Sequence, residues 1–168
     1  MKDIVNTVLD KVPAKYRDTA LIRLFGLTKV PLLFWLRPKV IELSDKRCSI
    51  LIPLNRRTKN HLNSMYFGVL ACGADAAGGL SAMKHIMQSG KKVSLAFKEF
   101  NAKFLKRAEG DVLFNCEQGE EISAFVEKVL ASDERQNMPV KIIATCPSID
   151  EHEPVAEFEL VLSLKKKS

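Results

Sequence analysis

The residue whose surroundings point most directly to chemistry is Asp75, a carboxylate within a run of small side chains. The run covers residues 65–88 and is rich in alanine and glycine, with Ala74, Ala76 and Ala77 flanking the aspartate. Such neighbours predict a buried segment, where a carboxylate must be hydrogen-bonded or functional. Asp75 could therefore act as a general base or a nucleophile, or it could be an ordinary solvated or ion-paired helix carboxylate.

Gly68 lies seven residues before Asp75, close to the expected start of the same helix. A helix N-terminus presents free backbone N–H groups and a partial positive charge, and a glycine there lets a substrate carbonyl approach the backbone. Close packing against another element is the alternative role for this glycine. Seven residues make two helical turns, so both residues share one face, but the rise between them is roughly 10 Å. A single helix therefore cannot supply both groups to one active site.

The elements that must position these residues can be predicted from hydrophobic periodicity. Helical spacing of apolar residues predicts helices over 5–12 and 16–27, with Gly26 helping to stop the second, followed by an apolar connector at 31–38. Residues 55–63 form a polar, basic loop. Alternating apolar residues predict strands at 40–43, 48–54, 93–98, 102–105, 111–117, 140–146 and 155–164, and helical spacing predicts a further helix at 122–130.

Residues 65–88 form the longest predicted helix, although glycine disfavours helices. Each interior glycine costs about 1 kcal/mol relative to alanine. So many small residues make sense if another element approaches the helix closely, as a curved sheet wrapped around it would. The order of elements indicates one α+β domain at residues 39–168, preceded by a helical extension at residues 1–38.

The segment from Asn60 to Asp75 carries a resemblance to a known family. It reads NHLNSMYFGVLACGAD and resembles the signature Asn-x-x-Gly-Thr-x-His-Gly-Gly-x-x-x-x-x-Ala-Asp of phenylacetate-type hotdog acyl-CoA thioesterases, with Asn60, Gly68 and Asp75 matching without a gap. Residues 104–111, FLKRAEGD, resemble the Phe-Leu-Arg-Pro-Ala-x-x-Gly-Asp junction of that family, one residue shorter. The likeness covers about residues 40–164 and implies a hotdog fold, an antiparallel sheet wrapped around a long central helix.

The chain departs from that signature around the helix start. Tyr66 replaces the histidine of the His-Gly-Gly triplet, Phe67 replaces its first glycine, and Asn63 replaces an earlier glycine. The chain is therefore similar to a branch of the superfamily that keeps the helix carboxylate and lacks the triplet. Fold is retained across such changes more readily than activity.

The resemblance implies a role for each matched residue in thioester hydrolysis. Asp75 would be the catalytic carboxylate, the Gly68 region the oxyanion donor, Asn60 the group that orients water or thioester, and Tyr66 a phenolic donor in place of histidine. Hotdog proteins dimerise so that the carboxylate of one subunit faces the helix start of the other, which removes the 10 Å difficulty. As structural alternatives, Asn60 is a loop or N-cap residue and Tyr66 a packing residue. The implied substrate-binding positions also include Asn63, Ser64 and Phe67.

The charge balance favours an anionic partner. The formal net charge is +6, and Lys106 and Arg107 stand at the matched junction, where cations could hold the phosphates of coenzyme A. The coenzyme A thioester would be a substrate, and no cofactor is expected. Nucleic-acid binding is not expected, because aromatic residues are not interleaved with the cations as a stacking platform requires. Each cation could also be an ordinary solvated surface charge.

Several other kinds of site are not expected. The four cysteines form no C-x-x-C pair and are typical of buried thiols in a reducing compartment. No cluster has metal-ligand spacing, and we expect His85 on an exposed helix face and His152 in a loop. The most apolar run, residues 30–36, is too short to span a bilayer, and the first eleven residues lack a secretory core, so a cytoplasmic protein without an integral membrane segment is expected.

Three functions are compatible with these residues. The first is an acyl-CoA thioesterase that works as a homodimer, with assembly into a tetramer left open. The second is a non-catalytic acyl-CoA or lipid-binding module that uses the same pocket. The third, dehydration of a hydroxyacyl thioester, needs a histidine base, and only His61 is near. The segment around Phe34 and Trp35 is expected to cover the acyl tunnel or a dimer surface.

Overall fold

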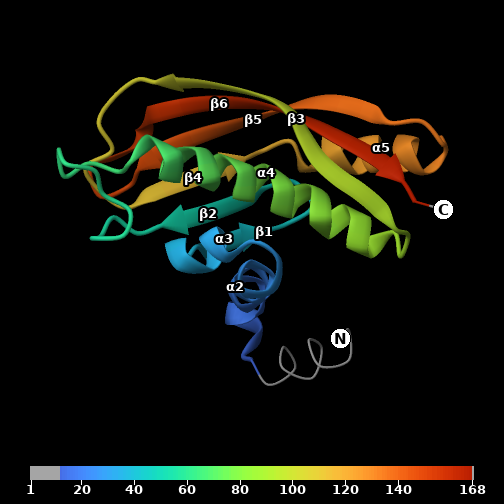
Figure 1. Cartoon of the computed structure of the whole chain (residues 1–168), viewed down its shortest axis with the longest axis horizontal. Helices are drawn as coiled ribbons and strands as arrows, with labels where there is room; N and C mark the ends of the chain where they lie inside the picture. Colours follow the sequence, from blue (N-terminus) through green and yellow to red (C-terminus); the bar gives the residue numbers. More distant parts are fainter. Residues whose placement is uncertain (1–11, 168) are drawn as a thin grey trace.

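A computed structural model describes residues 12–167 as a six-stranded antiparallel sheet with one long helix, α4 (Phe67–Gln88), lying along one face (Figure 1). The predicted α+β architecture and central helix are confirmed. A shorter helix, α5 (Gly119–Leu130), follows the fourth strand and packs beside α4. In sheet order the strands are β1 (Lys39–Leu43), β2 (Cys48–Ile52), β4 (Val112–Cys116), β5 (Gln136–Cys146), β6 (Asp150–Lys166) and β3 (Val93–Phe104).

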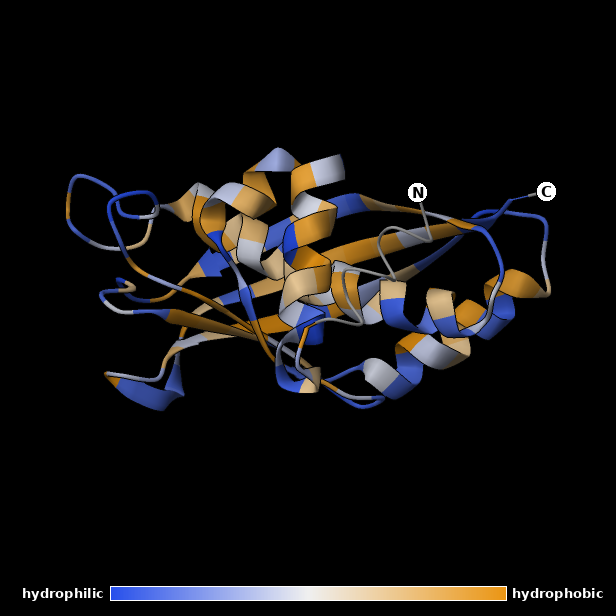
Figure 2. Ribbon diagram, turned by 90° about the horizontal axis from the view of Figure 1, so that it is seen from below, coloured by the Kyte–Doolittle hydropathy of each residue, from blue (hydrophilic) through white to orange (hydrophobic). Residues whose placement is uncertain are grey.

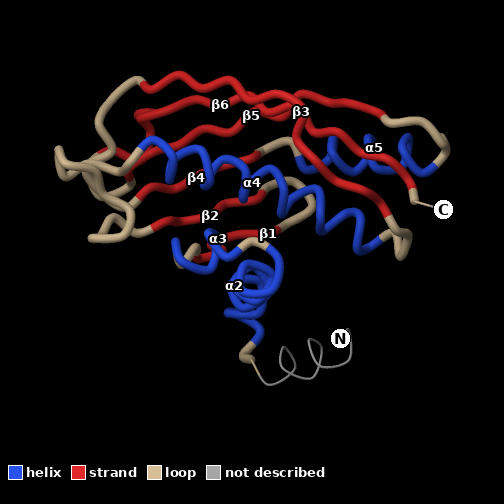
Figure 3. The backbone as a smooth tube through the Cα atoms, viewed as in Figure 1, coloured by secondary structure: helices blue, strands red, loops and turns tan. Residues whose placement is uncertain are grey.

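The two edges of the sheet differ in length and in cover (Figure 3). Edge strand β1 has five residues and is tied to the N-terminal helices, since the Val40 N–H donates to Thr19 Oγ1 at 2.9 Å. Edge strand β3 has twelve residues and pairs along β6, with a shift in register between Phe97 and Glu99. The prediction of two separate strands at 93–98 and 102–105 is wrong, because the polar residues between them continue the pairing.

The small residues of α4 let the sheet approach it closely, as predicted. Gly73 shows this best, because a Cβ built on it would lie 2.3 Å from the ring of Phe114, a fully buried side chain of β4. Ala74, Ala76 and Ala77 are buried as well. The glycines of α4 therefore lower its intrinsic helix propensity but allow close packing against the sheet.

A single methyl group at position 73 is expected to lower the free energy of unfolding. The Gly73→Ala change gains about 1 kcal/mol of helix propensity but overpacks the buried Phe114 ring, which costs about 2–3 kcal/mol, so a net loss of about 1–2 kcal/mol is expected. Gly79→Ala is the matched control, because its Cβ would meet the Phe97 ring at an ordinary 3.7 Å. Urea denaturation should show Gly79→Ala to be neutral or stabilising; equal losses in both variants would contradict the packing argument.

The N-terminal helices are an ordered part of the structure. The short 3-10 helix η1 (Ala14–Tyr16) leads into α2 (Arg17–Lys29), which confirms the helix predicted at 16–27, whereas most of the helix predicted at 5–12 lies outside the described residues. Gly26 does not stop α2. It is a packing contact, since a Cβ there would lie 2.6 Å from the backbone nitrogen of Phe34.

The segment predicted as a connector is a helix, α3 (Pro31–Leu36), that turns back against α2. Its proline stands at the first helical position, where the missing N–H costs nothing and the fixed φ suits a helix, so the prediction of a connector is wrong. Leu33 and Leu36 are buried, and Arg37 ends the helix in the left-handed region with φ 54°. None of the helices within residues 12–167 is long and apolar enough to cross a membrane.

Candidate active site

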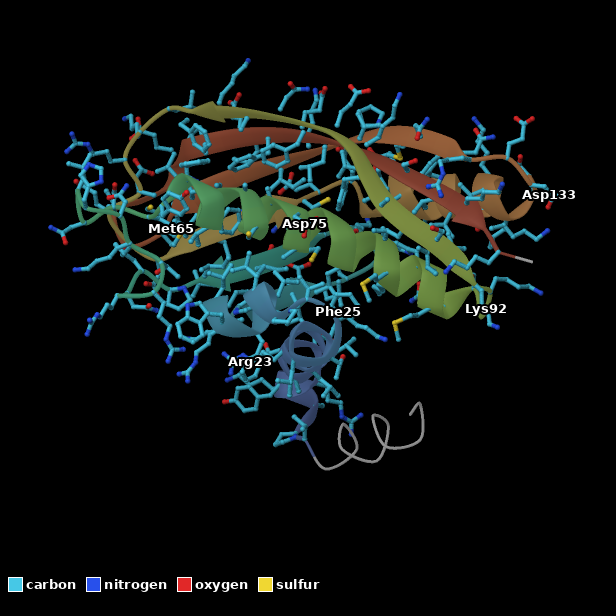
Figure 4. The ribbon with its side chains drawn as sticks, in the orientation of Figure 1. Arg23, Phe25, Met65, Asp75, Lys92 and Asp133 are labelled. Atoms are coloured by element: carbon cyan, nitrogen blue, oxygen red, sulfur yellow. The ribbon has the colours of Figure 1, made fainter. Side chains whose placement is uncertain are left out.

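Asp75 lies two turns into α4 on a face that looks toward the N-terminal helices (Figure 4). Its carboxylate is partly buried beside the apolar side chains of Leu21, Phe25 and Leu33. Within residues 12–167 this carboxylate accepts no hydrogen bond and forms no ion pair. Burial alone raises its pKa above the usual value of a carboxyl group. A carboxylate kept in such surroundings is not explained by stability, and it is a candidate for chemistry.

The start of α4 presents open backbone donors. Tyr66 is the N-cap residue, and its carbonyl accepts from Val69 and Leu70 at 2.9 and 3.1 Å. Among the described residues no side chain caps this end, and the N–H groups of Phe67 and Gly68 donate to nothing. Two amides at the positive end of a 22-residue helix are therefore free to bind a carbonyl oxygen or an oxyanion.

The loop over residues 55–66 and the junction after β3 meet at this helix start. The Tyr66 N–H donates to the Thr58 carbonyl, and the Met65 N–H donates to the Ala108 carbonyl, both at 2.8 Å. The second bond brings Lys106 and Arg107 to the same end of α4 as Gly68. Both side chains are exposed, and Lys106 forms an ion pair with Glu153. The structure thus gathers at one end of the helix all predicted site residues except Asp75.

Asn60 is engaged within its own loop. Its Oδ1 accepts from the Leu62 N–H at 2.8 Å and from the Ser64 N–H at 3.3 Å, and its Nδ2 donates to Ser64 Oγ at 3.1 Å. Ser64, expected as a substrate-binding residue, is buried by this arrangement. These contacts favour the loop-holding alternative for Asn60, while its role in orienting water stays a prediction.

Removing the Asn60 amide is expected to destabilise the loop before it affects chemistry. The Asn60→Ala variant loses the hydrogen bonds that the side-chain amide makes with Leu62 and Ser64, so the free energy of unfolding should fall by about 1–2 kcal/mol. His61→Ala, which truncates an exposed neighbour in the same loop, should stay within about 0.5 kcal/mol of the parent. Chemical denaturation of both variants checks this, and an unchanged stability for Asn60→Ala would rule out the structural role.

Asn63 explains one departure from the family signature. Its backbone adopts φ 61°, the left-handed region, and its Oδ1 accepts from Lys59 Nζ at 3.0 Å. Glycine takes this conformation without strain, and asparagine is among the few other residues that tolerate it. Asn63 therefore occupies, at the position where the family signature has glycine, a backbone conformation that glycine also adopts without strain.

Exposed aromatic rings surround the helix start, and this cluster was only partly predicted. The Tyr66 and Phe67 rings lie 4.7 Å apart, and Phe67 in turn meets the ring of Phe104 on β3 at 6.3 Å. Tyr66, Phe67 and Phe104 are 46, 59 and 50% exposed. Phe104 begins the segment that resembles the family's junction, but it was not predicted as a site residue, because its place next to the start of α4 depends on the pairing of β3 with the distant β6.

Two other chemistries find no support in the described residues. Burial raises the pKa of the Cys72 thiol, and the nearby Asp75 carboxylate raises it further, so this cysteine is not an activated nucleophile. No group of three His, Cys, Asp or Glu side chains within residues 12–167 could hold a metal ion. Cys48, Cys116 and Cys146 are free, buried thiols, as predicted.

Solved structures share this architecture at low sequence identity. A protein of unknown function from Chlorobaculum tepidum superposes with a TM-score of 0.78 at 13% identity, covering 92% of this chain and all of that one. A Pseudomonas aeruginosa protein, described as a probable thioesterase, gives 0.71 at 20% identity, with 89 and 96% covered. A thioesterase from Haemophilus influenzae gives 0.64 at 14% identity, with 88 and 89% covered. These likenesses show the fold.

The wrapped sheet, the central helix with its carboxylate, and these neighbours define a hotdog-fold protein of the kind found among thioesterases. Residues 19–161 match the model of a family described as a domain of unknown function, DUF4442, and the chain belongs to that family. The match begins within α2, so the family's domain includes the helices that lie over Asp75. No functionally curated protein matches the sequence.

Proposed function

We propose that this protein hydrolyses acyl-CoA thioesters, with the Asp75 carboxylate of one subunit acting beside the open helix start of another. The observation that carries the proposal is the unpartnered, partly buried carboxylate on the same helix as two unused backbone amides. A general base gains from a pKa raised toward the working pH, which is the direction that burial gives Asp75. The thioesterase neighbours of the same fold support this reaction class.

The proposed reaction divides between the two groups. Asp75 takes a proton from a water molecule as the water oxygen adds to the thioester carbonyl carbon. The amides of Phe67 and Gly68 stabilise the negative charge that develops on the carbonyl oxygen. The carbon–sulfur bond then breaks, the sulfur leaves as the coenzyme A thiolate and receives the proton, and the acyl group leaves as a carboxylic acid.

A homodimer is part of the proposal, because Asp75 lies roughly 10 Å along α4 from Gly68 of its own chain. Strand β3 offers the surface for it. Its twelve residues form an uncovered sheet edge, and a long unpaired edge bearing exposed aromatics such as Phe100 and Phe104 invites pairing with another chain. Antiparallel pairing of two β3 strands would bring the two α4 helices onto the same side of one continuous sheet.

Lys106 and Arg107 are the proposed contacts for the phosphates of coenzyme A. Both are exposed at the junction that Ala108 ties to the helix start, so they border the space through which the thiol would leave. The ion pair of Lys106 with Glu153 is exposed and is therefore weak enough to yield to a phosphate.

The test is the release of free thiol from a panel of acyl-CoAs by the purified protein. Turnover that rises with protein concentration and is absent from a mock purification supports hydrolysis. Thermal stabilisation by acyl-CoA without any release of thiol would instead favour the non-catalytic binding module, for which the replacement of the family's histidine by Tyr66 is the specific argument. Neither turnover nor stabilisation would overturn both functions.

A further inference from the structure

A small apolar cavity lies between α4 and the N-terminal helices. Its volume is about 50 Å³. Asp75 stands at its wall, and Figure 4 shows Asp75 on α4 close to Phe25 on α2. The other lining side chains are apolar or absent, and they come from α2, α3 and α4: Leu21, Ile22, Phe25, Leu33, Ala76, Gly79, Leu80 and Met83.

The side chains that line the cavity determine which kind of chemical group can bind in it. Asp75 is the one charged residue that borders the cavity within the described part of the chain, and all other neighbours are hydrocarbon, thioether or glycine. A group that fits must therefore be apolar, with its reactive or polar end directed at the carboxylate. The acyl chain of a thioester has this form, because its hydrocarbon tail is joined to the carbonyl carbon that water must attack.

The helices that line the cavity are held in place from several sides. Arg23 Nε donates to the Pro38 carbonyl at 3.2 Å, and Thr19 bonds to Val40 of β1. The guanidinium of Arg57, in the loop before α4, lies 4.7 Å from the centre of the Trp35 ring. Helix α3 packs against α4, and Figure 2 shows orange, apolar stretches on the helices near the centre of the molecule. The N-terminal helices that line the cavity are thus fixed to the rest of the fold by specific contacts.

The volume limits how much of an acyl chain can lie inside the cavity. A single water-sized position needs roughly 10–15 Å³, so a cavity of this volume holds about four such positions. About four carbon atoms, counting the carbonyl carbon, would fill it. A longer chain would have to displace lining side chains, among which Phe25 carries the aromatic ring and Met83 the flexible thioether.

We propose that this cavity is the acyl-binding subsite and that Phe25 and Met83 restrict the substrate to short acyl groups of about four carbons. The inference rests on the proposed thioesterase function and names its substrate class. It assigns the N-terminal helices a role in specificity, as a wall supplied by the same chain that carries Asp75.

Chain-length profiles of two opposite variants test the subsite. Phe25→Ala enlarges the cavity, so the ratio of kcat/KM for octanoyl-CoA to that for butanoyl-CoA should rise about tenfold over the parent. Gly79→Val adds a side chain to the cavity lining without a clash at Cβ, where the nearest atom belongs to the Phe97 ring at 3.7 Å. The ratio of kcat/KM for butanoyl-CoA to that for acetyl-CoA should therefore fall about tenfold. Leu27→Ala, on the same helix but exposed and outside the cavity, should leave the profile unchanged.

The outcomes separate the subsite from the reaction. In one outcome the parent hydrolyses acyl-CoAs while folded Phe25→Ala and Gly79→Val proteins show the same chain-length profile as the parent. That result would overturn the subsite and leave the thioesterase function standing. If the parent hydrolyses nothing, thermal shifts measured with butanoyl- and octanoyl-CoA still report binding. A chain-length preference in those shifts that moves with Phe25→Ala would support the subsite and overturn hydrolysis, and no shift with either ligand would overturn both.

Discussion

Replacing Asp75 with asparagine is expected to lower kcat for thioester hydrolysis at least about a hundredfold while making the folded protein more stable. The loss of activity follows because asparagine keeps the shape of the side chain but cannot accept a proton from water. The gain follows because the carboxylate is partly buried against apolar side chains with no hydrogen bond or ion pair among the described residues. Removing such a charge should stabilise the fold by on the order of 1 kcal/mol.

The two effects of this substitution should also depend on pH in a defined direction. Burial raises the folded-state pKa of Asp75 above its unfolded value, so the folded state retains a proton that the unfolded state releases. The contribution of Asp75 to stability is therefore highest below the unfolded value near 3.8 and is lost as the pH rises through the folded pKa. The gain in stability from Asp75→Asn should therefore appear at pH values above the folded-state pKa of Asp75 and vanish at low pH. The kcat of the parent should fall as acid protonates the carboxylate.

Asp45→Asn is the matched control for this experiment. Asp45 is exposed, and its carboxylate lies 2.5 Å from Lys84 Nζ, so its pKa is lowered rather than raised. Its substitution should leave kcat unchanged and should not stabilise the protein. Thiol-release kinetics and urea denaturation of the three proteins give the result. An Asp75→Asn protein that is less stable than the parent would show that the carboxylate has a structural role, and full activity would remove it from the reaction.

The sequence was most informative where a local pattern decides the structure. The small residues over 65–88 predicted both the central helix and its close approach to the sheet, which Gly73 and Phe114 confirm. The segment from Asn60 to Asp75 also located the helix start, since α4 begins at Phe67, while the role of Asp75 stays a prediction. These features are determined by residue size, capping and spacing within one segment, so they can be predicted without knowledge of distant contacts.

The connector predicted at 31–38 was wrong for a local reason, the proline that begins α3, whereas the other wrong predictions depended on contacts between distant segments. His85 was expected on an exposed face, yet it is 6% exposed because α5 packs beside the end of α4. Gly26 was expected to end a helix, but it accommodates the backbone of α3. The cavity beside Asp75 likewise depends on how α2 folds back over α4, which no periodicity within either helix reveals.

Mixing two inactive variants is expected to restore about a quarter of the parent activity, if the site is shared between subunits. Gly68→Val should block the approach of the thioester to the open amides and lower kcat about a hundredfold, within the range for losing an oxyanion donor. The fold should tolerate it, because the first atom a Cβ meets there is the ring of Tyr66, an exposed side chain that can move. Asp75→Asn inactivates the other half of the same site.

The arithmetic of a two-fold dimer gives the expected value. Equal amounts of the two variants, unfolded together and refolded, form half of their dimers as mixed pairs. Each mixed dimer has one site with both substitutions and one site with neither, so half of the sites in half of the dimers are intact. Activity near a quarter of the parent value therefore requires that Asp75 and Gly68 of one site come from different chains. No recovery, with mixed dimers demonstrated by differently tagged chains, would mean that each chain builds its own site and that the roughly 10 Å between the two residues is spanned in another way.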